Sequence, residues 1–390
     1  MATSERSVTT SAELLTAAED INIKTIVIAA DLSNLPSFRL LQGQSLTGAG
    51  PHATLRFAEG QDGLQLSADN RVEGVELTTD PARRAIFNDT TVAEFGRLVL
   101  KDLRVTGVIQ LLARDLVRGG HVVADDIDIV AADARHYDER PKGYGVEVIP
   151  GAFTLWNQQA DSAVIITANL LGLSAGRAGA PVRGSGIFVG GAGDTGGRLI
   201  VRSLETGAVH SDGGIVAGTP DRITGGVFVV SGAYADSVRN RGPVTTYGPN
   251  DMVLDNWGTV DHWVAEEKIT NATEMQCVLV HGFPFGGVLP PSEERIQACL
   301  NWTERISVPR ACRMPWSAAI PTLLRSMSPE TNPLTGCSAA DIVRQLPRTL
   351  SAQHMHSPVL SQSVDTRRMG DPMGQSLLFP SRKWLGNGQR

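Results

Sequence analysis

Short segments in which apolar and polar residues alternate recur through residues 25–270, with no amphipathic helix between them. Typical segments are KTIVIAA, GRLVLKDLRVTGVIQLL and GVFVVSGAYA, which begin at Lys24, Gly96 and Gly226. A period of two places successive side chains on opposite faces of a β-strand. Strands that return with a turn at intervals of roughly 20 to 25 residues predict a stack of coils, or solenoid, with function on a long exposed face.

One helix is expected before the strands, in the segment SAELLTAAED. Its Leu14, Leu15 and Ala18 share one side, and Ser11 is predicted to be its N-cap. The first coil of a solenoid would otherwise leave an open apolar core and unpaired backbone groups at its edge. We therefore expect this helix to cap the stack.

The composition changes at residue 270. All four cysteines and 12 of the 21 prolines lie beyond it, but only 8 of the 41 glycines do. Residues 1–270 carry 33 acidic and 23 basic side chains, whereas the remainder carries 8 acidic and 12 basic ones. This contrast predicts an N-terminal segment with its capping helix (1–22), the coils (23–270) and a divergent tail (271–390). We expect the tail to be irregular, partly helical and poorly ordered, either as a native appendage or as the product of a frameshift.

The sequence argues against several classes of partner. The cysteine spacings contain no CxxC pair, so a zinc site is not expected. The acidic body lacks the positive stripe that phosphates require, which argues against nucleic acid. No secretory signal is visible, and no stretch reaches the roughly 18 to 20 apolar residues of a membrane helix. We expect a soluble protein with no metal, no cofactor and no membrane partner, and its localisation stays open.

The capping helix, the strand entry KTIVIAA, the turn LQGQSLTGAG and the successive strand and glycine coils resemble the right-handed parallel β-helix proteins of the pectate-lyase-like superfamily. The resemblance covers about residues 11–270 and concerns the fold. It implies an all-β, right-handed parallel β-helix solenoid with three parallel sheets. In many members of that superfamily, polysaccharides are bound or cleaved in a cleft along one sheet.

Clustered aspartates are the first candidate for catalysis. Asp125, Asp126 and Asp128 lie in DDIDIVAAD, where Ile127 and Ile129 are expected to point to one face and Asp126 and Asp128 to the other. The β-helix hydrolases that resemble polygalacturonases use such carboxyl groups in pairs. One protonates the leaving oxygen and another activates water. The alternative is that these aspartates are solvated surface that keeps the sheet soluble.

Three later residues extend this candidate. His210 and Asp212 lie in VHSDGG and Arg222 lies one short coil further on, and they are similar to the histidine and basic groups of that family. The family's full set of aspartate, histidine and arginine motifs is not matched. A polysaccharide lyase would instead use the carboxylates to hold Ca²⁺ against an acidic sugar, with an arginine as base.

A candidate for substrate binding lies in the segment NDMVLDNWGTVDHW. Aromatic rings beside carboxylates and amides stack on sugar faces while the polar groups take the hydroxyls. The residues concerned are Asp255, Asn256, Trp257, Asp261, His262 and Trp263. The alternative is that the two tryptophans cover the last coil.

These patterns predict a protein that interacts with carbohydrate, with a polysaccharide or another extended ligand as its partner. Its enzymatic form would be a polysaccharide lyase or a glycoside hydrolase. A non-catalytic structural or adhesive solenoid is the alternative from a different class, and a truncated, inactive relative of either is a further one.

Overall fold

The computed structural model describes residues 4–50, 52–143, 145–219, 221–272 and 279–281. They all lie in the unit Met1–Gln345. The described residues form an all-β structure with two large, mostly parallel sheets. The tail predicted for residues 271–390 lies largely outside the described residues, and so do its four cysteines.

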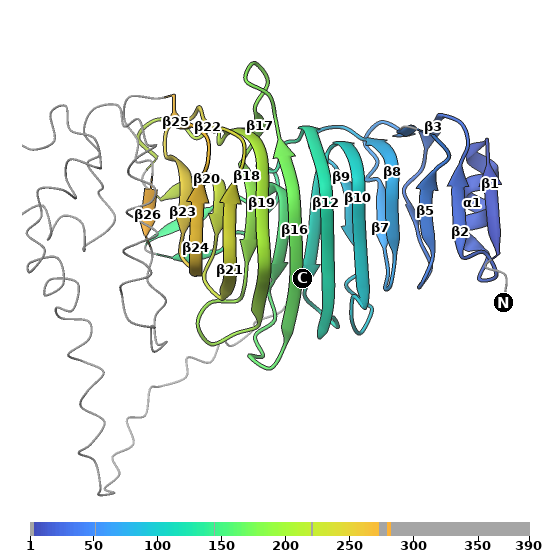
Figure 1. The fold of residues 1–390 in the computed structure, drawn as a ribbon, viewed down its shortest axis with the longest axis horizontal. Coiled ribbons are helices and arrows are strands. Elements are labelled where there is room, and N and C mark those ends of the chain that lie inside the picture. The colour runs from blue at the N-terminus through green and yellow to red at the C-terminus, as the bar shows by residue number, and fades with distance from the viewer. Residues whose placement is uncertain (1–3, 51, 144, 220, 273–278, 282–390) are drawn as a thin grey trace, which may run out of the picture. The chain divides into compact units, whose positions relative to one another are not determined.

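The first sheet has 15 described strands, which stand side by side in Figure 1. They are β1 (Glu5–Val8), β2 (Thr25–Ile28), β3 (Leu32–Leu35), β5 (Ser45–Gly48), β6 (Ala53–Phe57), β8 (Arg71–Thr78), β10 (Arg97–Thr106), β12 (Gly119–Ala131), β16 (Ile165–Ala175), β17 (Val182–Arg183), β19 (Arg198–Asp212), β21 (Ala233–Asn240), β22 (Val244–Thr246), β24 (Thr259–Ala265) and β25 (Ile269–Asn271).

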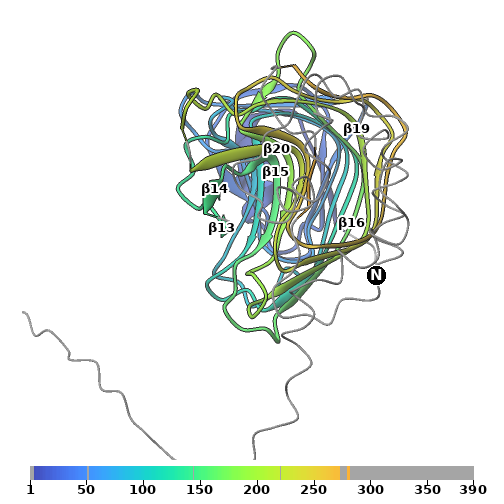
Figure 2. The same ribbon diagram turned by 90° about the vertical axis from the view of Figure 1, so that its left-hand side faces the viewer.

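The second sheet has 11 described strands. They are β4 (Phe38–Arg39), β7 (Leu64–Leu66), β9 (Arg84–Asn88), β11 (Val108–Ala113), β13 (Lys142–Gly143), β14 (Val146–Val148), β15 (Gly151–Asn157), β18 (Ser185–Gly190), β20 (Arg222–Val229), β23 (Asp251–Asn256) and β26 (Leu279–His281). In Figure 2, β16 and β19 of the first sheet form the curved wall on the right, while β13 and β14 lie on the opposite side.

The chain passes repeatedly from the first sheet to the second and back, and we call each such round a passage. Each strand pairs with its equivalents in the neighbouring passages, and β13 with β14 is the one antiparallel strand pair among the described strands. Thr25 lies opposite Ser45, 20 residues on, whereas His121 lies opposite Thr167, 46 residues on. The passages therefore exceed the predicted length in places, because the turns absorb insertions.

Apolar side chains of the first sheet stack in an unbroken ladder along the interior. Its members lie opposite one another in successive strands and are at most 2% exposed: Ile26, Leu46, Val72, Leu100, Ala124, Leu170, Leu204, Val238 and Trp263. Burying each large member stabilises the fold by about 1.5–3 kcal/mol. The alternating pattern of the sequence is the direct cause of this ladder, since every second residue faces inward.

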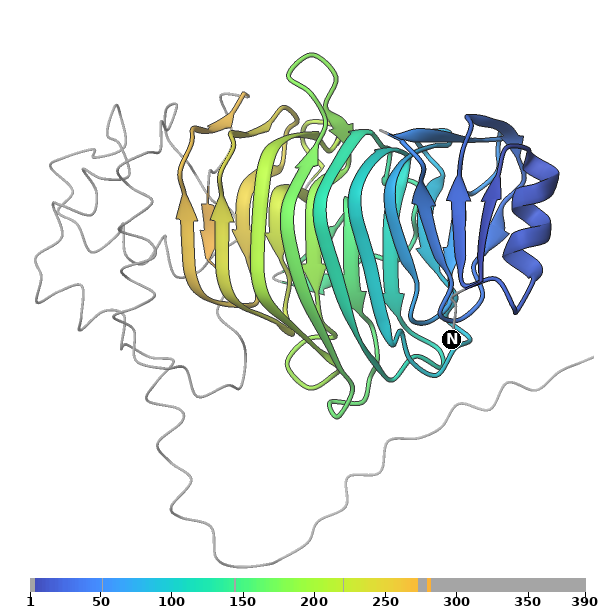
Figure 3. The ribbon, with the colours of Figure 1, turned by 45° about the vertical axis from the view of Figure 1, so that its right-hand side comes forward.

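Helix α1 (Ser11–Glu19) packs against β1 to β4, at the N-terminal end of the sheets (Figure 3). Its Leu14, Ala17 and Ala18 are buried. The predicted N-cap was wrong by one residue. Thr10 is the N-cap, because its hydroxyl accepts the Glu13 N–H while the Glu13 carboxylate accepts the Thr10 N–H, which completes a capping box.

Residues 132–143 and 145–150, which we call the excursion, follow β12, and β14 within them lies against apolar side chains on the outer face of the second sheet. Val146 and Val148 of β14 join Phe228, Trp257 and other apolar residues in a second buried cluster there. A Cβ atom on Gly143 would lie 2.6 Å from the Trp257 ring, so the approach requires glycine. The buried cluster under the excursion begins at Leu112 of β11 and includes no residue of β4, β7 or β9.

Two expectations about the architecture need adjustment. The family resemblance implied three parallel sheets, but the described residues form two, because the short strands β3, β6, β17, β22 and β25 join the first sheet. The strands also run past residue 270, since β25 ends at Asn271 and β26 pairs with β23 through Leu254 and Leu279.

Candidate functional site

Asp125 lies within a column of alternating charge across the first sheet. Glu73 of β8 lies opposite Lys101 of β10, and Lys101 lies opposite Asp125 of β12. The Lys101 Nζ atom is 3.7 Å from the Glu73 carboxylate. Unlike charges directly across neighbouring strands contribute roughly 0.2–1 kcal/mol per pair, which accounts for Asp125 without a ligand. Ile127 and Ile129 face the interior as predicted, at 0% and 1% exposure.

Asp126 is exposed and has a φ of 57°, in the left-handed region. The equivalent positions of the neighbouring strands have the same conformation, with φ of 66° at Gly74, 51° at Asp102 and 66° at Gly172. Glycine, aspartate and asparagine are the residues that tolerate this region best. The choice of Asp126 is therefore explained by a bend that runs across four strands.

Asp128 lies opposite Arg104 and forms an ion pair with Arg177, whose Nη2 atom is 2.7 Å from Asp128 Oδ2. The segment of Arg177 lies beside His210 of β19, since a Cβ atom on the adjacent Gly176 would clash with the His210 carbonyl oxygen. Burial and the charge of Arg177 lower the pKa of the His210 imidazole. His210 Nδ1 is 3.0 Å from the Tyr247 hydroxyl, and burial raises the pKa of Tyr247. The structure thus links Asp128 and His210 through one arginine.

Asp212 is the last residue of β19 and lies among charged side chains. It lies opposite Arg183 of β17, with which it forms an ion pair, and it accepts the Gly214 N–H at 2.8 Å. Arg135 lies nearby, since its pKa is raised chiefly by its hydrogen bonds to Asp133 and further by the charge of Asp212. Asp212 is therefore held by arginines rather than directed at His210.

Asp251 is a buried carboxylate beside Asp212, and it lies at the start of the segment NDMVLDNWGTVDHW, in which the sequence pattern placed the candidate for substrate binding. It accepts hydrogen bonds from the Gly248 N–H at 2.7 Å, the Thr224 hydroxyl at 2.6 Å and the Gly213 N–H at 3.0 Å. Burial, with a smaller contribution from the charge of Asp212, raises its pKa to about 6 against the effect of these donors.

The Asp212 and Asp251 carboxylates are close neighbours. A Cβ atom on Gly248 would lie 2.8 Å from Asp212 Oδ1 and 2.7 Å from Asp251 Oδ2, so these oxygens are at most about 5.5 Å apart. Asp251 is 0% exposed and both of its oxygens accept hydrogen bonds. In this structure it holds the turn together and does not face solvent.

Arg222 begins β20 and lies opposite Glu147 of the excursion. The pKa of Glu147 is lowered first by its hydrogen bond to Lys142 and in smaller part by Arg222. Arg222 thus belongs to a third location. Among the described residues, Asp128 pairs with Arg177, Asp212 pairs with Arg183, and Arg222 lies opposite Glu147.

The predicted binding residues of β23 are buried. Asp255 is 0% exposed, lies opposite Phe228, and neither of its oxygens has a hydrogen bond of good geometry. Burial raises its pKa well above the usual range, although the N–H groups of Asn256 and Trp257 lower it. Trp257 is 2% exposed in the second apolar cluster, and Asn256 is 4% exposed.

The residues of β24 divide between the two faces of the first sheet. Trp263 is 2% exposed and ends the interior ladder, so neither tryptophan offers a ring face to solvent. Asp261 and His262 are exposed. The six residues therefore do not form one platform in this structure, and the packing alternative accounts for Trp257 and Trp263.

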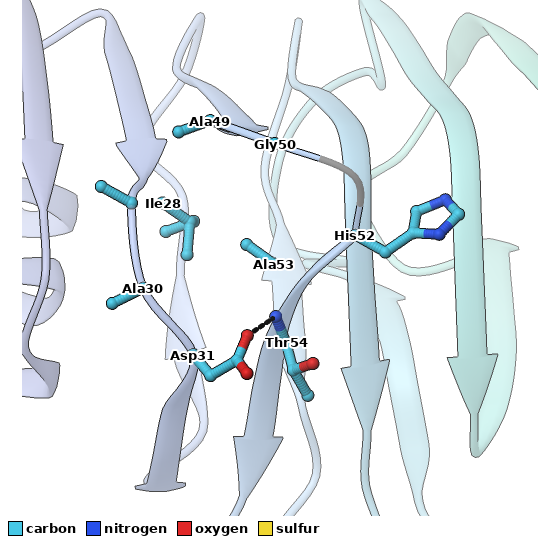
Figure 4. Close-up of a pocket in the computed structure, with 9 residues that line it drawn as sticks. Ile28, Ala30, Asp31, Ala49, Gly50, His52, Ala53 and Thr54 are labelled. Carbon is cyan, nitrogen blue, oxygen red and sulfur yellow. Dashed lines mark hydrogen bonds between the residues drawn. The ribbon is translucent and has the colours of Figure 1, made fainter.

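One hollow, of about 400 Å³, lies among the first passages (Figure 4). Alanines make up much of its lining. Asp31 accepts the Thr54 N–H at 2.9 Å. His52 points away from the hollow, and its Nε2 atom is 2.9 Å from Asp102 Oδ1. The two ionisable side chains that line this hollow, Asp31 and His52, thus both have partners within the protein.

A second hollow, of about 250 Å³, lies on the outer face of the second sheet, and we call it the amide groove. Its lining is Gln65, Arg84, Phe87, Asn88, Asp89, Thr90, Thr91, Gln110, Leu112 and Arg114. Gln65, Phe87 and Gln110 lie opposite one another on β7, β9 and β11. Neither glutamine side chain has a hydrogen-bond partner among the described residues. Two free amides therefore flank an aromatic ring.

The amide groove is closed on one side. Along the same column Arg39 is half exposed, Gln65 and Phe87 are intermediate, and Gln110 is 5% exposed. Thr154, the next member, is 0% exposed because the covered part of the face begins there. A ligand would therefore enter from the N-terminal side.

The charged groups of the amide groove are all paired. Arg84 forms an ion pair with Asp62, and its guanidinium carbon is 4.2 Å from the centroid of the Phe87 ring. Arg114 forms an ion pair with Glu139 of the excursion.

Asp89 is paired within the protein as well. Its Oδ2 atom is 2.8 Å from the Arg39 Nη1 atom, and its Oδ1 atom accepts the N–H and the hydroxyl of Thr91. Burial raises the pKa of Asp89, but these partners outweigh it and hold the pKa below its usual value.

Sequence reasoning missed the amide groove. Gln65, Phe87 and Gln110 are the outward residues of LQL, AIFN and VIQLL, and each is unremarkable within its own strand. Aligning the three passages would have placed them in one column, and that alignment is the signal that was available.

Two searches of the described residues gave negative results. No group of three or more histidine, cysteine, aspartate or glutamate side chains among them is arranged to hold a metal ion. No helix in that part of the chain has the length and apolar character needed to cross a bilayer.

The comparisons with known proteins supply no relative. No family model matches the sequence, and neither a curated protein nor a solved structure matches it.

Proposed function

We propose that this chain is a parallel β-helix that binds a polysaccharide, or a similar extended and hydroxyl-rich ligand, in the amide groove. The observation that carries this proposal is the column in which the free amides of Gln65 and Gln110 flank Phe87. Carboxamides both donate and accept hydrogen bonds, as sugar hydroxyls do. An apolar ring beside a few convergent polar groups is the usual composition of a small-ligand site.

The β-helix part of the proposal rests on the order of the strands. The chain alternates between two sheets, and its strands pair in parallel with the equivalent strands of the neighbouring passages. Crossovers between parallel strands of one sheet are right-handed in about 98% of cases, so we infer a right-handed winding like that of the pectate-lyase-like superfamily.

Binding without cleavage is the form that the geometry favours. A glycosidase needs two accessible carboxyl groups, one of them a general acid. Asp212 and Asp251 are close neighbours, but Asp251 is 0% exposed and accepts hydrogen bonds from three donors. The linked residues Asp128, Arg177 and His210 include one carboxylate. A polysaccharide lyase or glycoside hydrolase therefore remains the second candidate, and a scaffold without carbohydrate affinity is the third.

The test is calorimetric titration of the full chain with a panel of soluble oligosaccharides, together with assays for new reducing ends and for the absorbance of unsaturated sugars. Gln65→Ala and Gln110→Ala should each weaken binding by about 3- to 10-fold, the value of one lost hydrogen bond. Gln61→Ala is the matched control, because Gln61 is exposed and does not line the groove.

Binding that is equal in all three variants and the wild type would overturn the proposed site. New reducing ends or unsaturated products that disappear in Asp128→Asn would establish the enzymatic candidate instead. An absence of any binding across the panel would favour the scaffold.

A further inference from the structure

We infer that the ligand of the amide groove is an uncharged, hydroxyl-rich saccharide rather than a polyuronate or another acidic glycan. This inference rests on the proposed function and deepens it by naming the ligand class. It comes from the charges around the groove, each of which already has a partner of opposite sign in the protein.

The two arginines of the lining are the groups that an acidic sugar would need. Arg84 donates its Nε atom to Asp62 at 3.0 Å and its Nη2 atom to the same oxygen, and Asp62 also accepts the Arg84 backbone N–H at 3.0 Å. Arg114 donates to Glu139 and lies 3.7 Å from Asp115. A ligand carboxylate would have to share or displace these acidic partners.

The surrounding field also opposes an anion. Four carboxylates adjoin the groove, at Asp62, Asp89, Asp115 and Glu139, against the three arginines Arg39, Arg84 and Arg114. Residues 1–270 carry ten more acidic than basic side chains. Bringing a further carboxylate into a site without a net positive charge leaves its desolvation uncompensated, and the negative body repels an acidic polymer before contact.

An uncharged saccharide meets none of these obstacles. Its hydroxyls can take the free amides of Gln65 and Gln110, and the spare N–H groups of the guanidinium forks can donate to hydroxyl oxygens without losing their acidic partners. Such contacts depend weakly on ionic strength, because no net charge is neutralised on binding.

The experiment compares neutral and uronic-acid oligosaccharides of equal length by calorimetry with the full chain, at about 50 mM and about 500 mM NaCl. We expect neutral ligands to bind with less than about a twofold change across this range, and the uronates to bind about tenfold more weakly or not at all. Tighter binding of the uronates, weakened by salt, would overturn the inference while leaving the proposed function intact. No binding of either class would overturn both.

Two variants provide a gain-of-function test. Asp62→Asn frees Arg84 and Glu139→Gln frees Arg114, so each should increase uronate affinity by about tenfold and leave neutral binding within about twofold. Using both variants protects the test against a folding defect in either one.

Asp236→Asn is the matched control, because it frees Arg202, which is paired with Asp236 on the first sheet. Uronate affinity that is unchanged in both groove variants, or raised equally in the control, would contradict the inference that Asp62 and Glu139 keep Arg84 and Arg114 from binding a uronate.

Discussion

The indole N–H of Trp263 donates a hydrogen bond of 2.8 Å to the Oδ1 atom of Asn240. Asn240 in turn donates to the Thr206 hydroxyl at 2.8 Å, so this chain of bonds joins β19, β21 and β24 inside the first sheet. Asn240 and Thr206 are 0% exposed. The tryptophan that resembles a sugar platform in the sequence is therefore a core residue with a satisfied polar atom.

Substitution of Trp263 should test this role. Trp263→Phe keeps most of the apolar surface and loses one buried hydrogen bond, so we expect a loss of about 1–3 kcal/mol in the free energy of unfolding. Trp263→Ala should lose about 3–5 kcal/mol. Urea unfolding followed by circular dichroism measures both, and His262→Ala on the exposed side of the same strand is the control. A near-neutral Trp263→Ala would mean that the ring does not pack in the core.

Asp251 should make stability depend on pH. Its pKa is raised to about 6 in the folded state, from the ordinary 3.8, so the folded protein binds this proton more tightly than the unfolded chain does. The contribution of this group is therefore fully present below about pH 4 and is lost as the pH rises through about 6, on the order of 3 kcal/mol.

The measurement is the urea midpoint at a series of pH values. Asp251→Asn should be less stable at every pH, because its amide N–H₂ meets the backbone donors of Gly213 and Gly248, but its midpoint should vary less between pH 4 and 6 than that of the wild type. Parallel pH profiles in the two proteins would contradict the assignment.

Asp255 should be a residue whose removal stabilises the protein. Its carboxyl group is fully buried beside Phe228 without a well-formed hydrogen bond, and burial raises its pKa well above the usual range. Asp255→Leu should therefore raise the free energy of unfolding at pH 8 by about 1–3 kcal/mol, with a smaller gain at pH 5, where the wild-type carboxyl is more fully protonated.

Thermal unfolding at the two pH values measures this difference, with Asp261→Leu on the exposed face of β24 as the control. A lower melting temperature for Asp255→Leu at pH 8 would show that the carboxylate has a partner that stabilises it.

Asp126 should tolerate glycine and resist β-branched residues, because its φ is 57°. We expect Asp126→Gly to change stability by less than about 0.5 kcal/mol, whereas Asp126→Val should cost about 1–2 kcal/mol in the left-handed region. The same urea experiment separates them, and a cleavage activity that is equal in Asp126→Gly and the wild type would exclude an essential catalytic carboxylate at this position. Equal stability of the two variants would contradict the conformational explanation.

Parallel pairing was an expectation from the family resemblance and the N-terminal helix an expectation from the segment SAELLTAAED, whereas the alternation of apolar and polar residues predicted the strands and a continuous interior. These features follow from local periodicity, since a period of two decides which side chains face inward whatever the neighbouring strand is. Ile127 and Ile129 are examples. The cap of α1 was misplaced by one residue, because Thr10 and Ser11 are both good N-caps and only the backbone conformation distinguishes them.

The register between strands and the burial of side chains beneath distant segments were decided by the tertiary structure alone. The spacing between equivalent strands varies from 20 to 46 residues, so the sequence does not reveal that Gln65, Phe87 and Gln110 lie in one column, or that Arg177 joins Asp128 to His210. Trp257 looks exposed in its own segment and is buried because the excursion, more than 100 residues earlier in the chain, folds over it. Contacts of this kind depend on turn lengths and on distant side chains, which no local pattern encodes.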